Sequence, residues 1–224
     1  MGQNGMAGIW RGRTGGLLIA ALCAGASYWP AAHLLPHAPE ALIIAWKGLG
    51  VALLAAWVFA AVPGRDGRWL AAVLALGALG DVLLDAVSLT VGAVAFLAGH
   101  VLAVPFYWRH RSGRASRAAM VAVAALAAGV VALAASLPTD RAAAPGIAFY
   151  SSGLAAMAAM AALSRFRLAA SGALLFVISD LLIFAGLGPL AGSPATLLVW
   201  PLYFAGQALI AVGAGRALVR CQAG

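Results

Sequence analysis

The sequence predicts an all-α polytopic membrane protein with eight transmembrane helices, and three observations lead to this fold class. First, 64% of the 224 residues are hydrophobic and only 9% are charged. A soluble domain is about one quarter charged and about half apolar, and a disordered chain is poor in apolar residues, so both classes are excluded. Second, the apolar residues form long solid runs instead of the alternating pattern of a membrane β-barrel. Third, the basic residues are distributed unevenly between these runs.

Eight runs are long enough to cross the hydrocarbon core as helices, which takes about 20 mostly apolar residues. They cover residues 15–32, 41–62, 69–90, 91–108, 117–137, 145–163, 168–188 and 195–217. The third and fourth runs are continuous, and we expect the turn between them at Ser88-Leu89-Thr90-Val91-Gly92. The chain is therefore predicted to have an N-terminal tail (1–14), an eight-helix transmembrane domain (15–217) and a C-terminal tail (218–224).

The positions of the basic residues test this number of helices. With eight helices, only Arg141 falls on one side of the membrane, and the other side receives Arg11, Arg13, Arg65, Arg68, Arg109, Arg111, Arg114, Arg117, Arg165, Arg167, Arg216 and Arg220. Cytoplasmic loops carry an excess of Lys and Arg, so both termini are predicted to be cytoplasmic, in a bacterial inner membrane. Adding or removing one helix destroys the alternation.

The formal net charge of +8 has the same explanation. In a soluble protein it would indicate nucleic acid, but here we expect no nucleic-acid partner and instead contact with membrane lipids. A signal peptide is an alternative for the first run, because Ala24-Gly25-Ala26 resembles a cleavage site. The apolar run continues past that site to Ala32, which favours a transmembrane helix.

The two halves of the chain show a faint similarity. The third run contains Gly80-Asp81-Val82-Leu83-Leu84 and the seventh contains Ser179-Asp180-Leu181-Leu182. The helices that follow them carry Gly99-His100 and Gly206-Gln207. This pairing is compatible with a 4+4 parallel internal repeat, and equally with chance similarity between Ala/Leu-rich segments.

Four charged residues lie inside the predicted helices: Lys47, Asp81, Asp85 and Asp180, joined by the titratable His100. A charge at the centre of a transmembrane helix costs at least about 2.5–3.5 kcal/mol, so such residues are functional candidates with partners nearby. From the helical rise, they lie about 7–14 Å from the helix ends opposite the arginines. Tyr150, Tyr203 and Gln207 fall in the same layer, which predicts a shared polar pocket.

Asp81 and Asp85 are four residues apart and therefore share one helix face. Two close carboxylates resist simultaneous ionisation, so at least one is expected to stay protonated and to serve as a general acid. Each residue also has a structural interpretation: Lys47 as a snorkelling lysine, Asp85 as a helix-end residue, and His100 and Gln207 as hydrogen-bonding links between helices.

Motifs of other chemistries are missing from the sequence. There is no Gly-rich phosphate loop, no GxSxG elbow and no HExxH, and the spacing of His100 and the aspartates matches no metal motif. We therefore expect neither a metal nor another cofactor.

Several segments together resemble the YhhN family: Gly80-Asp81-x-Leu-Leu, Gly99-His100, Gly172-Ala-Leu-Leu-Phe-x-Ile-Ser179-Asp180 and Tyr203-x-Ala-Gly-Gln207. The resemblance runs from about Lys47 to about Gln207, and Lys47 precedes Gly48-Leu49 where the family usually has Pro-Leu. It implies an eight-helix membrane hydrolase similar to the animal lysoplasmalogenases. These cleave the vinyl-ether bond of a lysophospholipid to a fatty aldehyde and a glycerophospho-base.

The resemblance also implies roles for the residues in the polar layer. Asp81 and Asp180 would be the carboxylic acid and the carboxylate of the reaction. His100, Asp85, Tyr150, Tyr203 and Gln207 would support them or relay protons, and Lys47 would contact the substrate phosphate or fix a carboxylate. The alternative from another class is a secondary transporter that uses Asp81 and Asp180 as proton sites. A third is a structural membrane protein in which the polar layer only holds the helices together.

Overall fold

The computed structural model describes residues 13–113 and 115–222, and in that part of the chain it contains eight helices long and apolar enough to cross a membrane. They are α2 (Arg13–Leu34), α3 (Glu40–Ala61), α4 (Gly64–Ala86), α5 (Leu89–Arg109), α6 (Arg117–Ser136), α7 (Ala144–Leu163), α8 (Arg167–Gly186) and α9 (Val199–Gln222). Short 3-10 helices, η1 (Arg141–Ala143) and η2 (Pro194–Leu198), precede α7 and α9. The predicted number of membrane-spanning helices is confirmed, and the protein is an integral membrane protein.

The third and fourth helices are separated near the predicted turn, but only Ser88 of its five residues lies in the break, because residues 89–92 belong to α5. Helix α4 ends at Ala86, α5 begins at Leu89, and the Ser88 hydroxyl accepts a hydrogen bond from the Val91 amide at 3.2 Å. This serine cap satisfies one of the amides that have no partner in the first turn of a helix.

Several boundaries differ from the prediction: α4 ends at Ala86 instead of residue 90, α9 begins at Val199 instead of residue 195, and two helices are extended. Helix α4 begins at Gly64, five residues before the predicted run, and α9 continues to Gln222, through residues that we assigned to the C-terminal tail. Both extensions carry arginines, so hydropathy marks the apolar layer whereas the helix continues into the polar interface.

Gly64 has a φ of 85°, a left-handed conformation that suits glycine, and it lets the chain turn sharply out of α3. Most of the predicted N-terminal tail, residues 1–12, lies outside the described residues.

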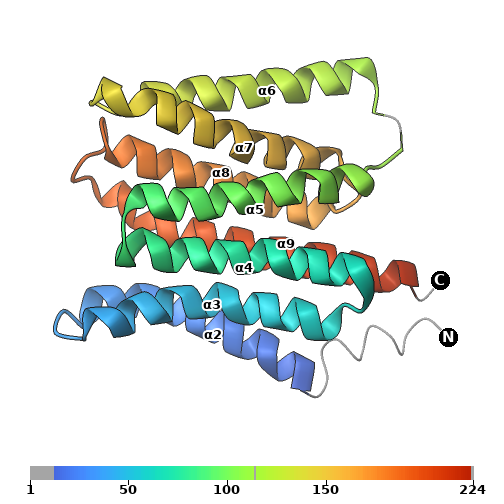
Figure 1. Ribbon diagram of the computed structural model, residues 1–224, viewed down its shortest axis with the longest axis horizontal. Helices are drawn as coiled ribbons and strands as arrows, with labels where there is room; N and C mark the ends of the chain where they lie inside the picture. The colour runs from blue at the N-terminus through green and yellow to red at the C-terminus, as the bar shows by residue number, and fades with distance from the viewer. Residues whose placement is uncertain (1–12, 114, 223–224) are drawn as a thin grey trace.

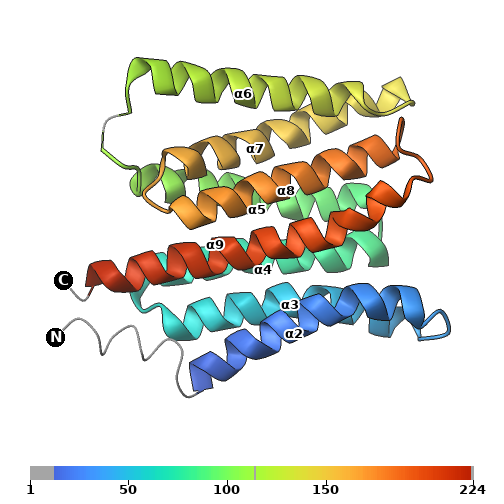
Figure 2. The same ribbon diagram turned by 180° about the vertical axis from the view of Figure 1, so that it is seen from behind.

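The helices run side by side and alternate in direction, so that α2 begins and α9 ends at the same end of the bundle (Figures 1 and 2). We call this end the arginine-rich end; it carries Arg65, Arg68, Arg109, Arg111, Arg117, Arg165, Arg167, Arg216 and Arg220. Arg141 lies in η1 at the opposite end. Arg11 and Arg114 lie outside the described residues. The cytoplasmic location of the arginine-rich end stays a prediction.

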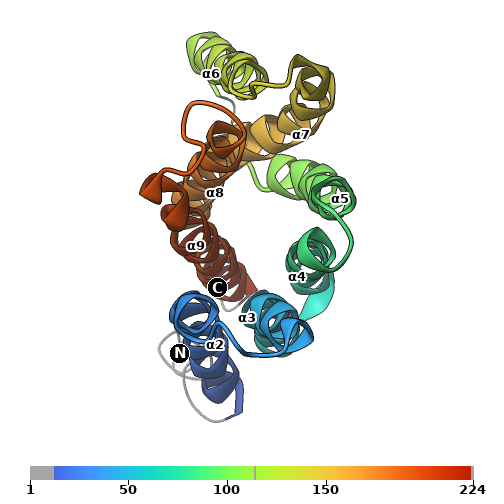
Figure 3. The same ribbon diagram turned by 90° about the vertical axis from the view of Figure 1, so that its left-hand side faces the viewer.

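Viewed along the bundle, α2, α3, α4, α5, α7, α8 and α9 form an elongated ring, and α6 lies outside it (Figure 3). Most helices pack against their neighbour in sequence, but α5 packs on α7 and not on α6. Helix α9 also contacts α2, α3 and α4, which brings the two long sides of the ring together. The space that remains inside the ring is therefore bounded by helices from both halves of the chain.

Helices α8 and α9 approach each other at two glycines. A Cβ atom added to Gly172 would lie 2.5 Å from the Gly206 carbonyl oxygen, and one added to Gly206 would lie 2.7 Å from that of Gly172. Small residues let membrane helices pack closely, where van der Waals contact replaces the hydrophobic effect as the driving force. Tyr203 and Gln207 lie on either side of Gly206 in sequence, so this contact also positions two predicted site residues.

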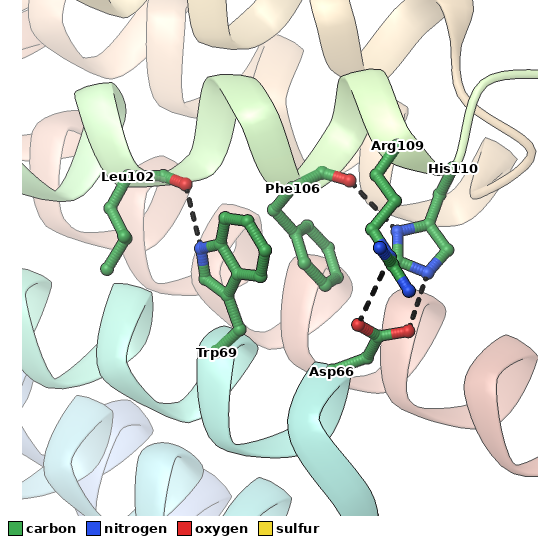
Figure 4. A network of polar contacts seen from close by, with 6 residues as sticks. All are labelled: Asp66, Trp69, Leu102, Phe106, Arg109 and His110. Carbon is green, nitrogen blue, oxygen red and sulfur yellow. Dashed lines mark hydrogen bonds and ion pairs between the residues drawn. The ribbon is translucent and has the colours of Figure 1, made fainter.

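At the arginine-rich end, a polar network joins α4 to α5 (Figure 4). His110 Nε2 lies 3.0 Å from Asp66 Oδ2, its Nδ1 lies 2.9 Å from the Phe106 carbonyl oxygen, and Arg109 is 3.6 Å from Asp66. Nearby, the Trp69 indole donates to the Leu102 carbonyl at 3.0 Å. Helix α5 contains Pro105, which lacks an N–H group and disturbs the helical hydrogen bonds next to it. The carbonyl that Pro105 leaves without a helical donor is that of Val101, so the tryptophan hydrogen bond to Leu102 is a separate link between α4 and α5.

Candidate active site

A cavity of about 570 Å³ lies inside the ring, in the half of the bundle away from the arginine-rich end. Its wall is formed by the last turns of α2, α4 and α8 and the first turns of α5, α7 and α9, together with Lys47 of α3. Five predicted site residues lie on this wall, and they come from five different helices: Lys47, Asp81, Tyr150, Asp180 and Tyr203. The predicted shared polar pocket is thus present in the structure.

Asp81 is held by a chain of hydrogen bonds from α9. Its side chain is only 2% exposed, and the Tyr203 hydroxyl donates to its Oδ2 at 2.8 Å. Gln207 Nε2 donates in turn to the Tyr203 oxygen at 3.2 Å. Gln207 lies one helical turn beyond Tyr203, on the side away from the cavity, so it orients the tyrosine without lining the cavity itself.

Asp180 has a corresponding arrangement on the other side of the cavity. It is 5% exposed, and the Tyr150 hydroxyl donates to its Oδ2 at 2.6 Å. His100 Nε2 lies 3.3 Å from the same hydroxyl, and the histidine is buried behind the tyrosine. Each carboxylate therefore has a phenol as its first partner and a second polar group behind the phenol, an amide for Asp81 and an imidazole for Asp180.

Lys47 and Asp85 form an ion pair near the two aspartates. Lys47 Nζ lies 2.8 and 2.9 Å from the two Asp85 oxygens, with side chains 14% and 31% exposed. Lys47 is therefore bound to a carboxylate in the last turn of α4, and its own side chain is mostly buried. Asp85 does not line the cavity, and its nearest charge is Lys47; the structure joins it to the lysine and not to Asp81.

Aromatic rings separate the two hydrogen-bond chains. The Phe176 ring lies 5.0 Å from that of Tyr203 and 5.1 Å from that of His100, and Phe96 packs edge-on against both Phe176 and Tyr203. These rings fill the space between the two chains with apolar atoms. Hydrogen bonds and charges interact more strongly in such surroundings than in water.

Sequence reasoning missed several residues of the cavity wall. Tyr28 and Trp200 pack against each other with ring centroids 4.4 Å apart, and Trp29 and His33 also lie on the wall. Aromatic residues near helix ends are typical of the membrane interface, so the sequence carries no signal that distinguishes these from lipid-facing ones. Ser179 lies on the wall too, but its hydroxyl donates to the Val199 carbonyl at 2.9 Å and so joins α8 to the start of α9.

The site offers two carboxyl groups, three phenols, an imidazole and an ammonium group, on walls that are otherwise mostly apolar. Such a set can deliver and accept protons and can bind an anionic, largely apolar molecule. Among the described residues, no three His, Cys, Asp or Glu side chains gather as metal ligands.

Comparison with known proteins identifies the family. A model of the YhhN family matches residues 42–214, which include every residue of the site except those on α2. No curated protein sequence and no solved structure matches the chain. Because the family match covers well over half of the chain, the protein belongs to the YhhN family.

Proposed function

We propose that the protein is a membrane hydrolase that cleaves the vinyl-ether bond of lysoplasmalogen-type lipids, giving a fatty aldehyde and a glycerophospho-base. The observation that carries the proposal is the presence of two buried carboxyl groups, Asp81 and Asp180, on the wall of one largely apolar cavity. Membership of the YhhN family, which includes lysoplasmalogenases, supports the same reaction.

Vinyl-ether hydrolysis suits this set of residues. A proton is transferred to the β-carbon of the double bond, which leaves an oxocarbenium ion at the carbon bonded to oxygen. Water adds to that carbon and loses a proton, and the resulting hemiacetal collapses to an aldehyde and an alcohol. One water is consumed and no electrons are transferred. The reaction needs a carboxylic acid and a carboxylate, the same pair that glycoside hydrolysis uses.

The two hydrogen-bond chains differ, and the proposed division of roles between the aspartates is based on this difference. Behind Tyr150 lies His100, which exchanges protons, whereas behind Tyr203 lies Gln207, which does not. A proton given up by Asp180 is therefore replaced through Tyr150 and His100, so Asp180 is the acid in this proposal.

In this proposal Asp81 has the remaining role, that of the carboxylate. Asp85 lies one helical turn from Asp81, and it holds the Lys47 ammonium group in that part of the cavity wall. Asp81 then accepts the proton of the attacking water.

The test is aldehyde release by the purified protein in detergent micelles. Lysoplasmenylcholine and lysoplasmenylethanolamine are expected to yield one aldehyde per lipid consumed. The saturated alkyl-ether analogue is expected to yield none, because it has no double bond to protonate. Asp81→Asn and Asp180→Asn are each expected to lower the rate of release about 1000-fold. Asp140→Asn is the matched control, because Asp140 caps η1 outside the cavity.

Two results would overturn the proposal: no aldehyde from the wild-type protein, or wild-type activity in both Asp81→Asn and Asp180→Asn. The transporter alternative has less structural support, because α4 and α8 run without a break through Asp81 and Asp180, whereas transporter sites typically use discontinuous helices. Proton-coupled uptake into vesicles without lipid turnover would favour transport. Loss of thermal stability in the Asp variants, with neither activity, would favour a structural role.

A further inference from the structure

The cavity has two chemically different sides. On the side of α2 and α3 its wall carries Tyr28, His33 and Lys47, which are hydrogen-bonding or basic groups. On the side of α5 and α7 it carries apolar side chains such as Val94, Leu97, Ile147 and Phe149. Asp81 and Asp180 lie on helices between these two sides (Figure 3). The cavity therefore has a polar side, a carboxylate region and an apolar side, in that order around the ring.

The apolar side is open between α5 and α7. The two helices pack closely at Gly153, where an added Cβ would clash with Leu97 and touch His100. About two turns closer to the start of α7, a Cβ at Gly146 would meet no atom within 4 Å, although Gly146 lies on the cavity wall. Figures 1 and 3 show the same divergence of α5 and α7 toward the end away from the arginines.

The side chains at this opening are exposed as well as lining the cavity. Val94 of α5 is 63% exposed and Phe149 of α7 is 72% exposed. Each lies five residues from the start of its helix, about 8 Å along the helix axis. That depth is inside the hydrocarbon layer, so what faces the opening is lipid. The opening lies in the leaflet opposite the arginine-rich end.

We propose that the substrate enters from this leaflet through the opening between α5 and α7. Its hydrocarbon chain lies between Val94 and Phe149, and its phosphate lies on the side of Lys47. This orientation rests on the proposed function, and it adds to that function the direction in which a lipid with one chain and a phosphate in its headgroup lies in the cavity. The bond between the chain and the glycerol then falls in the carboxylate region, between Asp81 and Asp180.

Lys47 is suited to the phosphate because its ammonium group carries three N–H donors and Asp85 accepts from it on one side. Asp85 fixes the position of the ammonium group, and the phosphate approaches it from the cavity.

The substitution Val94→Trp narrows the opening between α5 and α7. Val101 provides the matched control, because it lies two turns further along the same face of α5, is 60% exposed and does not line the cavity.

The experiment is photo-crosslinking of the full-length protein in nanodiscs. The probe is an ester-linked lysophosphatidylcholine with a diazirine near the end of its chain; it has no vinyl ether, so its binding is independent of catalysis. We expect crosslinks, mapped by mass spectrometry, within residues 89–97 and 142–150. Val94→Trp is expected to reduce the crosslinking yield about tenfold, which corresponds to roughly 1.4 kcal/mol of binding free energy. Val101→Trp is expected to leave the yield unchanged.

A second probe tests the orientation of the headgroup. Lys47→Met is expected to weaken crosslinking of the phosphate-containing probe but not that of a neutral monoacylglycerol with the same chain. Crosslinks on α2 and α3, or equal effects of Val94→Trp and Val101→Trp, would overturn the inference even if aldehyde is released. Specific crosslinks at the opening without aldehyde release would instead overturn the proposed function and leave the inference standing.

Discussion

Tyr150 connects Asp180, which lines the cavity, to His100, which lies behind it. Its hydroxyl donates to Asp180 Oδ2 at 2.6 Å and lies 3.3 Å from His100 Nε2. A phenol has one proton to donate, so a hydroxyl that donates to Asp180 accepts from an Nε2–H group of His100. The hydrogen bonds then run in one direction, from the imidazole through the phenol to the carboxyl group.

Replacing Tyr150 by Phe removes both hydrogen bonds and keeps the ring. We expect aldehyde release to fall about 100-fold, because Asp180 loses its positioning donor and its route to His100. The melting temperature in detergent should fall by a few degrees, because two hydrogen bonds to buried groups are lost, but the protein should stay folded at the assay temperature. Tyr107→Phe is the matched control, since Tyr107 is also buried but lies off the cavity wall. An equal loss of activity in both variants would contradict the relay.

Asp81 and Asp180 are expected to act as a unit. Each single change to Asn should lower the rate about 1000-fold, and the double variant should be hardly slower than either single variant, because the acid and the carboxylate serve one reaction. Initial rates of aldehyde release from the three variants measure this directly. If the two losses multiply, the residues contribute independently and the paired mechanism is wrong.

Much of the fold could be predicted because the membrane imposes simple rules. Apolar runs of about 20 residues and the alternation of arginines are enough to count eight helices. The high cost of a charge in the hydrocarbon layer also singles out Lys47, Asp81 and Asp180 from the sequence alone. These signals depend on single residues and their depth along a helix, which the sequence contains.

The partners of those residues could not be predicted in the same way. Asp81 pairs with Tyr203 from α9, and Asp85 with Lys47 from α3, because of how the helices pack around the ring. Helical periodicity tells which residues share a face but not which face of another helix lies opposite. The network of Asp66 with His110 was missed for the same reason, since both residues lie where hydropathy indicates only polar connections.

The ion pair of Lys47 with Asp85 predicts a difference between single and double variants. Lys47→Met leaves the Asp85 carboxylate without its partner, and Asp85→Asn leaves the Lys47 ammonium group without its counter-charge, so each should lower the melting temperature. The double variant Lys47→Met/Asp85→Asn should recover most of the stability but not the activity toward a phospholipid. Thermal unfolding and aldehyde release, measured on the same samples, separate the two effects. Recovery of both would show that the lysine has no role in substrate binding.

The network at the arginine-rich end should affect stability and not catalysis. In Asp66→Asn, His110 loses a carboxylate partner 3.0 Å away. The Arg109 contact, 3.6 Å from Asp66 with an arginine 60% exposed, contributes little. We expect the free energy of unfolding of Asp66→Asn to fall by about 1 kcal/mol, which lowers the melting temperature by roughly 2–4 °C. The turnover rate below the melting temperature should stay at the wild-type value, because the cavity lies in the other half of the bundle. A reduced turnover rate in a folded Asp66→Asn protein would show that the two ends are coupled.

The contact between α8 and α9 should tolerate no side chain. In Gly206→Val, the new Cβ would lie 2.7 Å from the Gly172 carbonyl oxygen and 3.2 Å from the Phe176 amide nitrogen, both backbone atoms that cannot move aside. The helices must then separate, which displaces Tyr203 and Gln207 together and removes the support of Asp81. We expect loss of both thermal stability and activity.

Gly129→Val in α6 is the control, because its Cβ would meet nothing within 4 Å and valine suits a lipid-facing position. Wild-type melting temperatures in both Gly206→Val and Gly129→Val would contradict this prediction. The packing of α8 on α9 would then not depend on the glycine contact, and other residues of α9 would set the position of Tyr203.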